Sequence, residues 1–494
     1  NTWGFGQTEE GYPFASTANA NPSVHMPIPM RYYLDVQGLS APTLSDISDD
    51  NSVYPITDET RQGDWKGRYT SASGHDFYTA RLFPKKYWNK TAFVADPTVR
   101  LLGKFRMESD GSAFVAKNKW NMLASRDEWT TPIGAKVGPD GALWVQDWYN
   151  FIPQHNLGPF AEHWEHGDNN AYLEELRDRD HGRIYRILPE DHEGGYEPMS
   201  LEEASAEELV EALTHTNMFW RLTAQRKLVE RGETDVAEQL YALIESESID
   251  AIGLDPGAIH ALWTLEGLGL LEGDDERAIE IARQALYHPS AGVRRNALKV
   301  LPSHADDRTE IVEGSLLQDV DGQVRRAAFL ALADTPSDRA TGEAVFEAFL
   351  TPNNGLDRWI PDAATAAGAA HPLGFVMAAL TTHPNAVQAG DEDREAAVEA
   401  VAEAARAVAR DYASTGPQDA IAELLLYMQY ASSRWGSAVA TGLAEGWPED
   451  VAPNIAYAQE QRIGQTVDDI HPDVKEALGD LTEKWDASGL FSGW

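Results

Sequence analysis

The sequence predicts a multidomain protein, all-β in its first part and all-α in its second: a partial β-propeller followed by a HEAT-like α-solenoid. Up to about residue 187, short apolar stretches alternate with Gly, Pro and Asp turns, which is the pattern of strands. From Ser200 onward, apolar residues recur with helical spacing. Four alanines, at positions 224, 261, 297 and 328, lie 31–37 residues apart, which is a helical-repeat period. We expect a propeller portion over 1–190, a linker over 191–199, HEAT-like repeats over 200–385, and further helical repeats or a helical tail over 386–494.

The stretch around residues 138–148 organises the β half. Gly138-Pro139-Asp140-Gly141 is a turn signal, because Pro fixes φ and Gly accepts a positive φ. The strand-forming residues 142–148 follow it, as at the start of many propeller blades. Residues 92–95 and 101–105 predict two further strands, and residues 183–187 predict a final one.

The helical half begins with a predicted N-cap at Ser200 and a capping-box glutamate at Glu203. Arginines recur within its repeats at Arg221, Arg294 and Arg325. These side chains either line one side of the superhelix or pair with acids of the neighbouring repeat, as stacked repeats commonly do.

The amino-acid composition excludes several cofactors and classes of partner. Without cysteine, the sequence has no disulfide, no thiolate metal site and no covalently bound c-type haem. The net charge is −39, of which residues 1–190, with 25 acids and 19 bases, carry only −6. Such acidity argues against nucleic acid and anionic lipid as partners. Because salt screens self-repulsion, a high-salt habitat is one hypothesis, and an ordinary acidic helical surface is the alternative. No apolar run approaches the ~20 residues of a membrane span.

His75-Asp76 is the first candidate site. A His-Asp pair after a small-residue turn suits a base with its orienting acid, or two metal ligands. Neighbours on a strand point to opposite faces, so the two share one site only if the backbone turns there. A buried structural histidine is the alternative.

The second candidate site follows the central strand. Asp147 and His155 are candidates for polar or metal contacts near a propeller channel, and Arg183 could bind an anionic cofactor or a carboxylate. In the alternative, Trp148 serves inter-blade packing and Asp147 caps a turn. Arg183 would then form a minor surface ion pair.

Three motifs carry a family resemblance: residues 73–89 (SGHDFYTARLFPKKYWN), 128–156 (EWTTPIGAKVGPDGALWVQDWYNFIPQHN) and 181–187 (HGRIYRI). In this order they resemble the large bacterial membrane-bound dehydrogenase proteins. Those have a propeller similar to quinoprotein glucose/sorbosone dehydrogenases, then HEAT-type repeats, and usually a cytochrome c module, whose CxxCH motif is absent here. A propeller of six blades at ~45 residues each exceeds 190 residues, so we expect the chain to be part of a longer protein.

The resemblance implies an exported, periplasmic or extracellular dehydrogenase, associated with a membrane, if at all, through parts outside this sequence. It would bind pyrroloquinoline quinone with Ca²⁺, oxidise a sugar or a sugar-derived alcohol or aldehyde, and pass electrons to a cytochrome c module. The implied roles are His75 as base, Asp147 as metal ligand, and Trp148, His155 and Arg183 as cofactor contacts. The alternative is a non-catalytic propeller–solenoid scaffold that binds a polysaccharide or a protein partner. A hydrolase has little support, since GxSxG and HExxH are absent.

Overall fold

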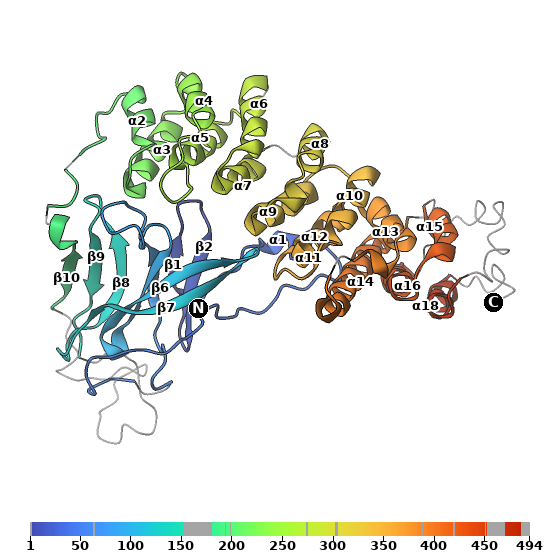
Figure 1. Cartoon of the computed structure of the whole chain (residues 1–494), viewed down its shortest axis with the longest axis horizontal. Coiled ribbons are helices and arrows are strands. Elements are labelled where there is room, and N and C mark those ends of the chain that lie inside the picture. The colour runs from blue at the N-terminus through green and yellow to red at the C-terminus, as the bar shows by residue number, and fades with distance from the viewer. Residues whose placement is uncertain are drawn as a thin grey trace. The chain divides into compact units, whose positions relative to one another are not determined.

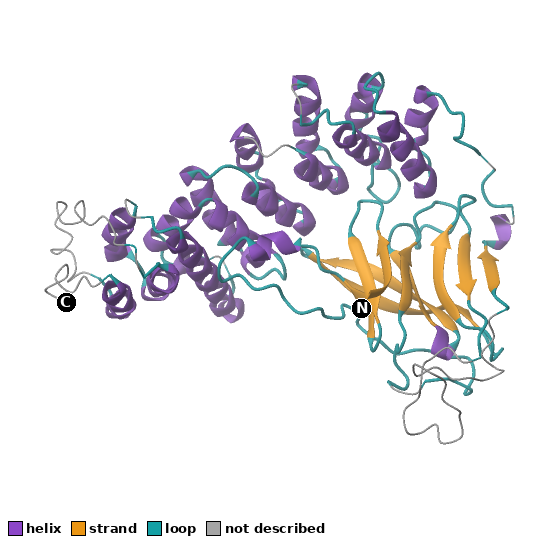
Figure 2. Cartoon of the chain, turned by 180° about the vertical axis from the view of Figure 1, so that it is seen from behind, coloured by secondary structure: helices purple, strands orange, loops and turns teal. Residues whose placement is uncertain are grey.

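The β-then-α order predicted from the sequence is confirmed by a computed structural model (Figures 1 and 2). The chain divides into two compact units. The first comprises Asn1–Pro27, Thr43–Asp110 and Phe114–Ile281, and the second comprises Ile28–Pro42, Gly111–Ala113 and Ala282–Trp494. The structure describes residues 2–62, 65–151, 180–192, 194–197, 199–272, 275–301, 305–387, 389–417, 420–449, 451 and 470–485.

Three small antiparallel sheets make up the β region, in the orders β1-β2-β3, β4-β5-β6-β7 and β10-β9-β8. Within the described part of the chain they close into neither a barrel nor a propeller. The strands predicted around residues 92–95, 101–105, 142–148 and 183–187 are all present. The strands of the three sheets are β1 (Thr2–Gln7), β2 (Pro13–Thr17), β3 (Asn21–Val24), β4 (Ser73–Phe77), β5 (Thr91–Asp96), β6 (Leu101–Asp110), β7 (Ala113–Ala124), β8 (Pro132–Val137), β9 (Leu143–Asp147) and β10 (Arg183–Ile187).

The first strands of the three sheets lie against one another, β1 on β4 and β4 on β8. Glycines permit this approach. A Cβ on Gly4 would lie 2.3 Å from the backbone nitrogen of His75, and one on Gly74 would lie 2.4 Å from the Cα of Gly134. Backbones therefore meet where side chains would otherwise separate the sheets.

Two hydrophobic cores lie on either side of the middle sheet. Strand β5 is buried along its whole length and contributes Val94 to one core and Phe93 to the other. The first core includes Phe14 of β2, and the second includes Leu143 and Val145 of β9. Each core thus joins the middle sheet to one neighbour, because alternate residues of a strand face opposite sides.

The helices of the first unit begin one turn later than the sequence suggested. The predicted cap at Ser200 and Glu203 is wrong: the capping box is Ser205 with Glu208, and residues around Leu201 form a turn. Both serines precede a glutamate by three residues, so the local signal was degenerate. The helices are α2 (Ala206–Ala212), α3 (Met218–Arg231), α4 (Ala237–Glu245) and α5 (Pro256–Gly267), with α6 (Glu276–Gln284) crossing the boundary between the units.

Helix α3 is attached to the predicted organising turn of the β region. The side-chain amide of Asn217, its N-cap, donates to the carbonyl of Gly138 at 2.8 Å, and the indole of Trp220 donates to that of Pro139 at 2.9 Å. The turn at residues 138–141 therefore initiates β9 on one side and supports the start of α3 on the other.

The second unit is helical and includes a short segment from early in the sequence, Ile28–Pro42, with α1 (Met30–Leu34). This segment donates hydrogen bonds to aspartates of three successive helical layers, including Tyr33 to Asp362 and the backbone of Gln37 to Asp411, both at 2.8 Å. The helices are α7 (Ala291–Val300), α8 (Ala305–Glu313), α9 (Gly322–Ala333), α10 (Arg339–Phe349), α11 (Pro352–Gly355), α12 (Ile360–Ala370), α13 (Pro372–Thr381), α14 (Asp391–Ser414), α15 (Ile421–Tyr427), α16 (Ser433–Gly446) and α18 (Pro472–Lys484).

The periodic alanines and arginines take the places expected of packing residues. Ala224, Ala261, Ala297 and Ala328 are fully buried, one each on α3, α5, α7 and α9. Arg294 on α7 forms an ion pair with Asp319, which precedes α9, as expected for pairing between neighbouring repeats.

No single helix in the described ranges is long and apolar enough to cross a membrane. The bent pair α12 and α13, which meet at 112°, meets that criterion only by combined length and composition.

Candidate functional site

His75 lies on β4 with no exposed surface. Its Nε2 is 3.0 Å from the hydroxyl of Ser23, and its ring lies parallel to that of Phe14, with centroids 5.9 Å apart. Burial, assisted by the charge of Lys136, lowers the pKa of His75 to about 3. The imidazole is therefore neutral at pH 7, whereas a general base works best with a pKa near the operating pH. The role of base stays a prediction.

His75 belongs to a group of buried polar atoms where β1, β2 and β4 meet. Its Nδ1 and the hydroxyls of Ser16 and Ser73 have no hydrogen-bond partner among the described residues. Ser73 and His75 are two residues apart and so lie on the same, buried face of β4. Unpaired polar atoms in an interior are rare, and such a group is a natural place for an internal water or a polar ligand.

Asp76 does not share this environment. It points to the other face of β4, where its carboxylate lies 2.9 Å from the ammonium of Lys136. Burial raises the pKa of Asp76, and Lys136 opposes that effect. The backbone therefore separates the two members of the predicted pair, as strand geometry requires.

Asp147 ends β9 and is almost fully buried, with 3% of its surface exposed. One carboxylate oxygen accepts hydrogen bonds from the backbone N–H groups of Thr131 (2.7 Å) and Tyr149 (2.8 Å). The other accepts from the hydroxyl of Tyr185 at 2.8 Å. Asp147 thus ties the turn after β9 to the residue before β8 and to β10.

Trp148 and Arg183 lie at the same corner, because Arg183 pairs with Asp147 in the β9–β10 ladder. The guanidinium of Arg183 covers the ring of Tyr149 at 3.5 Å and lies 3.3 Å from Asp127. Trp148 is 41% exposed. The structure therefore brings together Asp147, Trp148 and Arg183, but places His75 on a different sheet. His155 lies outside the described residues.

Among the described residues of this corner, Asp147 has no oxygen free of hydrogen bonds. A calcium ligand needs a carboxylate oxygen directed at the ion, and those of Asp147 already accept hydrogen bonds from Thr131, Tyr149 and Tyr185. Arg183 is shared between Asp127 and Tyr149. Binding of a quinone with Ca²⁺ at this corner stays a prediction.

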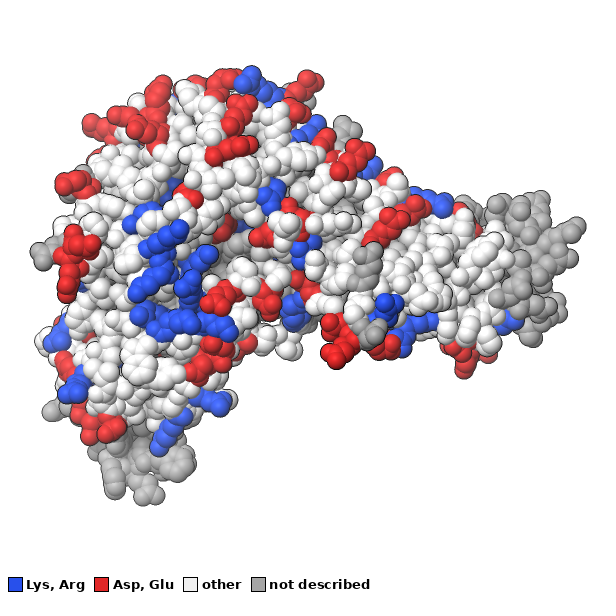
Figure 3. All heavy atoms as spheres, in the orientation of Figure 1, with Lys and Arg blue, Asp and Glu red and all other residues white. Residues whose placement is uncertain are grey.

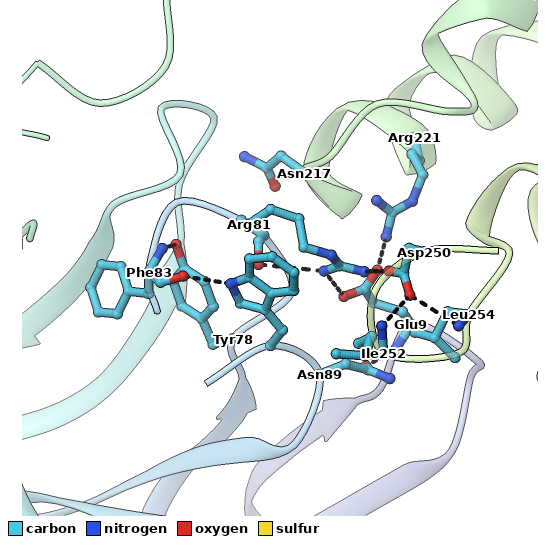
Figure 4. A network of polar contacts seen from close by, with 12 residues as sticks. Glu9, Tyr78, Arg81, Phe83, Asn89, Asn217, Arg221, Asp250, Ile252 and Leu254 are labelled. Atoms are coloured by element: carbon cyan, nitrogen blue, oxygen red, sulfur yellow. Dashed lines mark hydrogen bonds and ion pairs between the residues drawn. The ribbon is translucent and has the colours of Figure 1, made fainter. Parts of the chain in front are cut away.

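A buried charge cluster was not foreseen from the sequence (Figure 4). The guanidinium of Arg81 donates hydrogen bonds to both carboxylate oxygens of Glu9, at 2.6 and 3.0 Å, and to Asp250 at 2.8 Å. Arg221 of α3 also bonds Glu9, and both of those side chains are at most 1% exposed. Arg221 was expected either to line a superhelix or to pair with an acid of the next repeat. It pairs instead with Glu9 of the β region, and both residues belong to the first unit. A sequence signal for such a pairing does not exist, because 212 residues separate the partners.

An exposed aromatic pair lies at the edge of the middle sheet. The rings of Tyr54 and Trp120 stack with centroids 4.5 Å apart and an interplanar angle of 26°, and Trp120 is 56% exposed. Trp120 sits within β7 at φ 65°, a conformation that bulky residues rarely adopt. The side-chain amide of Asn121 donates to the carbonyl of Tyr54 at 2.6 Å and ties the two together. The sequence signal was available: a lone tryptophan in the polar stretch Lys117–Asn121.

The fold and these sites define a two-part protein, in which packed β-sheets with exposed aromatic residues precede a series of packed helices. Residues 1–191 match a family described as a domain of unknown function (DUF7133). That match covers the three sheets and ends before α2. No curated protein matches this chain.

Proposed function

We propose that this chain is a binding protein: a propeller–solenoid scaffold whose β region binds a polysaccharide on the stacked pair Tyr54–Trp120. The observation that carries the proposal is the conformation of Trp120. Trp120 is 56% exposed, so core packing does not explain its position, yet its backbone has a positive φ. Backbone strain of this kind costs about 1–3 kcal/mol and is concentrated at functional sites.

The pair has the chemistry that a sugar needs. The apolar face of a pyranose ring packs on an exposed aromatic face, while its hydroxyl groups need polar neighbours. Lys119 precedes Trp120 and is exposed, as Trp120 is, because the irregular backbone interrupts the usual alternation. Asn118 holds the loop beneath Tyr54 through two 3.0 Å bonds to the carbonyls of Asp50 and Ser52. The stacked pair, which we call the Tyr54–Trp120 platform, is therefore held in place before any ligand binds.

The propeller and solenoid parts of the proposal rest on the packing of the elements. The first strands of successive sheets lie together, and one core fills each space between sheets, as in neighbouring propeller blades. A complete ring of six would include sequence beyond the three sheets. In the helical part, buried alanines at repeat spacing support HEAT-like units, and the family resemblance supports a location outside the cytoplasm.

The test is glycan binding by the whole chain and by Trp120→Ala, with Trp148→Ala as a control for loss of another exposed tryptophan. Affinity electrophoresis in gels containing dextran or xylan gives the retardation of each protein. We expect Trp120→Ala to weaken binding about fivefold, since an aromatic stacking contact contributes about 1 kcal/mol. Equal retardation of wild type and Trp120→Ala on every glycan would overturn the proposal.

A second candidate is the dehydrogenase suggested by the family resemblance, with a cytochrome c module as electron acceptor. The observation that favours it is the group of unpaired buried atoms on Ser16, Ser73 and His75. Dye reduction by the protein with pyrroloquinoline quinone, Ca²⁺ and aldoses would support it, particularly if His75→Gln abolished the reaction. Absence of dye reduction by the whole protein would reject it.

A further inference from the structure

A cluster of cations lies on the middle sheet, in a protein with a net charge of −39. Figure 3 shows lysine and arginine gathered over the strands of the β region. Five of these cations lie on β6 and on the segment between β4 and β5, and we call them the basic patch. Its members are Lys85, Lys86, Lys90, Lys104 and Arg106.

The members of the basic patch are neighbours in space. The ammonium groups of Lys86 and Lys104 lie 5.4 and 5.9 Å from the centre of the Tyr87 ring. Arg106 stands opposite Thr91 in the β5–β6 ladder, and the backbone carbonyl of Lys90 accepts a 2.7 Å hydrogen bond from Met107. Strand β6 and the turn against it thus hold the cations on a fixed backbone.

None of the five cations forms an ion pair with any described residue, although acidic residues outnumber basic ones about two to one. Four of the five are exposed and Lys104 is half-buried. Elsewhere in the first unit, lysines near carboxylates do form pairs, as Lys136 does with Asp76 and Lys117 with Asp49. Like charges held together without counter-charges repel one another, and a polyanion that binds across them relieves that repulsion.

We infer that the basic patch binds an anionic polysaccharide, a chain of uronate or sulfated sugars. This inference rests on the proposed function and adds its charge class. The patch and the Tyr54–Trp120 platform belong to one sheet, because β6 and β7 are adjacent strands of it. Lys119, beside Trp120, adds a further cation to the platform itself.

The aromatic ring within the patch argues for a sugar chain over a nucleic acid. Single-stranded nucleic acids bind by stacking their bases on open aromatic faces. Lys86 and Lys104 both lie over the ring of Tyr87 and so occupy the surface on which a base would stack. A polysaccharide carboxylate or sulfate needs only the ammonium groups.

The experiment compares polygalacturonate with neutral dextran as ligands of the whole chain at about 0.1 M salt, where charges several ångströms apart are still felt. The variant is Lys86→Gln with Lys90→Gln. The matched control is Arg226→Gln with Arg277→Gln, which removes the same charge from exposed helix positions that are 67% and 58% exposed.

We expect wild type and control to bind polygalacturonate alike, and the lysine variant to bind it at least about tenfold more weakly. Dextran retardation should be the same in all three proteins. Unchanged polygalacturonate affinity in the lysine variant would overturn the inference, as would single-stranded DNA binding the wild type more tightly than polygalacturonate does. The proposed function fails separately, if Trp120→Ala binds every glycan as wild type does.

Discussion

The first unit contains two groups of charged side chains that are arranged in opposite ways. In the buried cluster around Glu9, two arginines and two carboxylates neutralise one another. In the basic patch, four lysines and one arginine lie together, and none has a carboxylate partner in the described part of the chain. The first arrangement stabilises the fold, since a buried charge that lost its partner would be strongly unfavourable. The second is not neutralised by any carboxylate of the described residues, which is why we assign it to a ligand.

The largest effect should come from removing the centre of the buried cluster. Glu9→Gln leaves Arg81 with Asp250 alone and leaves Arg221, which is fully buried, without its carboxylate. Breaking a buried pair on one side costs about 3–5 kcal/mol. We therefore expect the free energy of unfolding, measured by urea denaturation with circular dichroism, to fall by that amount.

Glu233→Gln is the matched control for Glu9→Gln. Glu233 pairs with Arg231 on the surface and is 65% exposed, so its loss should change stability by less than about 1 kcal/mol. Similar losses in both variants would mean that burial does not distinguish the two kinds of charge.

His75 extends the comparison to pH. Its pKa is lowered to about 3 by burial, with Lys136 contributing, whereas an unfolded histidine titrates near 6.5. The unfolded chain therefore binds a proton before the folded one does. The stability that His75 provides is complete above about pH 6.5 and is lost as the pH falls toward 3.

Between pH 7 and pH 4.5, His75 should account for a loss of roughly 2–3 kcal/mol in the free energy of unfolding. The measurement is the difference between wild type and His75→Gln across that range, because the difference removes the contributions of Asp76 and other carboxylates. Parallel pH profiles would show that the pKa of His75 is the same in the folded and the unfolded chain.

A substitution of Asp147 tests whether its carboxylate, both oxygens of which accept hydrogen bonds, stabilises the fold. Asp147→Asn removes the charge that accepts two backbone N–H groups and the Tyr185 hydroxyl, and hydrogen bonds to charged groups contribute about 1.5–3 kcal/mol each. Because an amide oxygen retains part of this bonding, we expect a net loss of about 2 kcal/mol. Asp191→Asn, at a side chain 82% exposed, should change little.

The same variant also addresses the metal role predicted for Asp147. Ca²⁺ should leave the unfolding midpoints of wild type and Asp147→Asn equally unaffected. A Ca²⁺-dependent stabilisation of wild type that is missing in the variant would favour the metal role instead.

Local patterns predicted the elements well, but they did not reveal which side chains meet one another in the fold. Period-2 and period-3.6 spacing located strands such as β9 and helices such as α9, because those periods follow directly from backbone geometry. The buried alanines were predictable for the same reason. The N-cap of α2 was misplaced because two Ser-x-x-Glu patterns lie five residues apart.

The use of a polar side chain depends on partners that are distant in sequence. Glu9 meets Arg81 and Arg221 across 72 and 212 residues, and nothing local to Glu9 indicates this. Trp120 illustrates the opposite failure, since its local signal was visible but its positive φ and its stacking on Tyr54 were not. Sequence reasoning favoured His75 and Asp147 because their chemistry suits catalysis, while the ordinary lysines of the patch attracted no attention.

The smallest effect is the sharpest test of the comparison. Lys90 has neither an ion-pair nor a cation–π partner among the described residues, so Lys90→Gln removes only repulsion from its neighbours, and the free energy of unfolding should stay constant or rise by a few tenths of a kcal/mol. Lys136→Gln, which breaks the pair with buried Asp76, should instead lower it by up to about 1 kcal/mol. Both are single lysine neutralisations in the β region, so overall charge changes identically and only the local partner differs. Destabilisation of both variants would mean that the patch lysines have a structural role, and the basis for assigning them to an anionic ligand would then be lost.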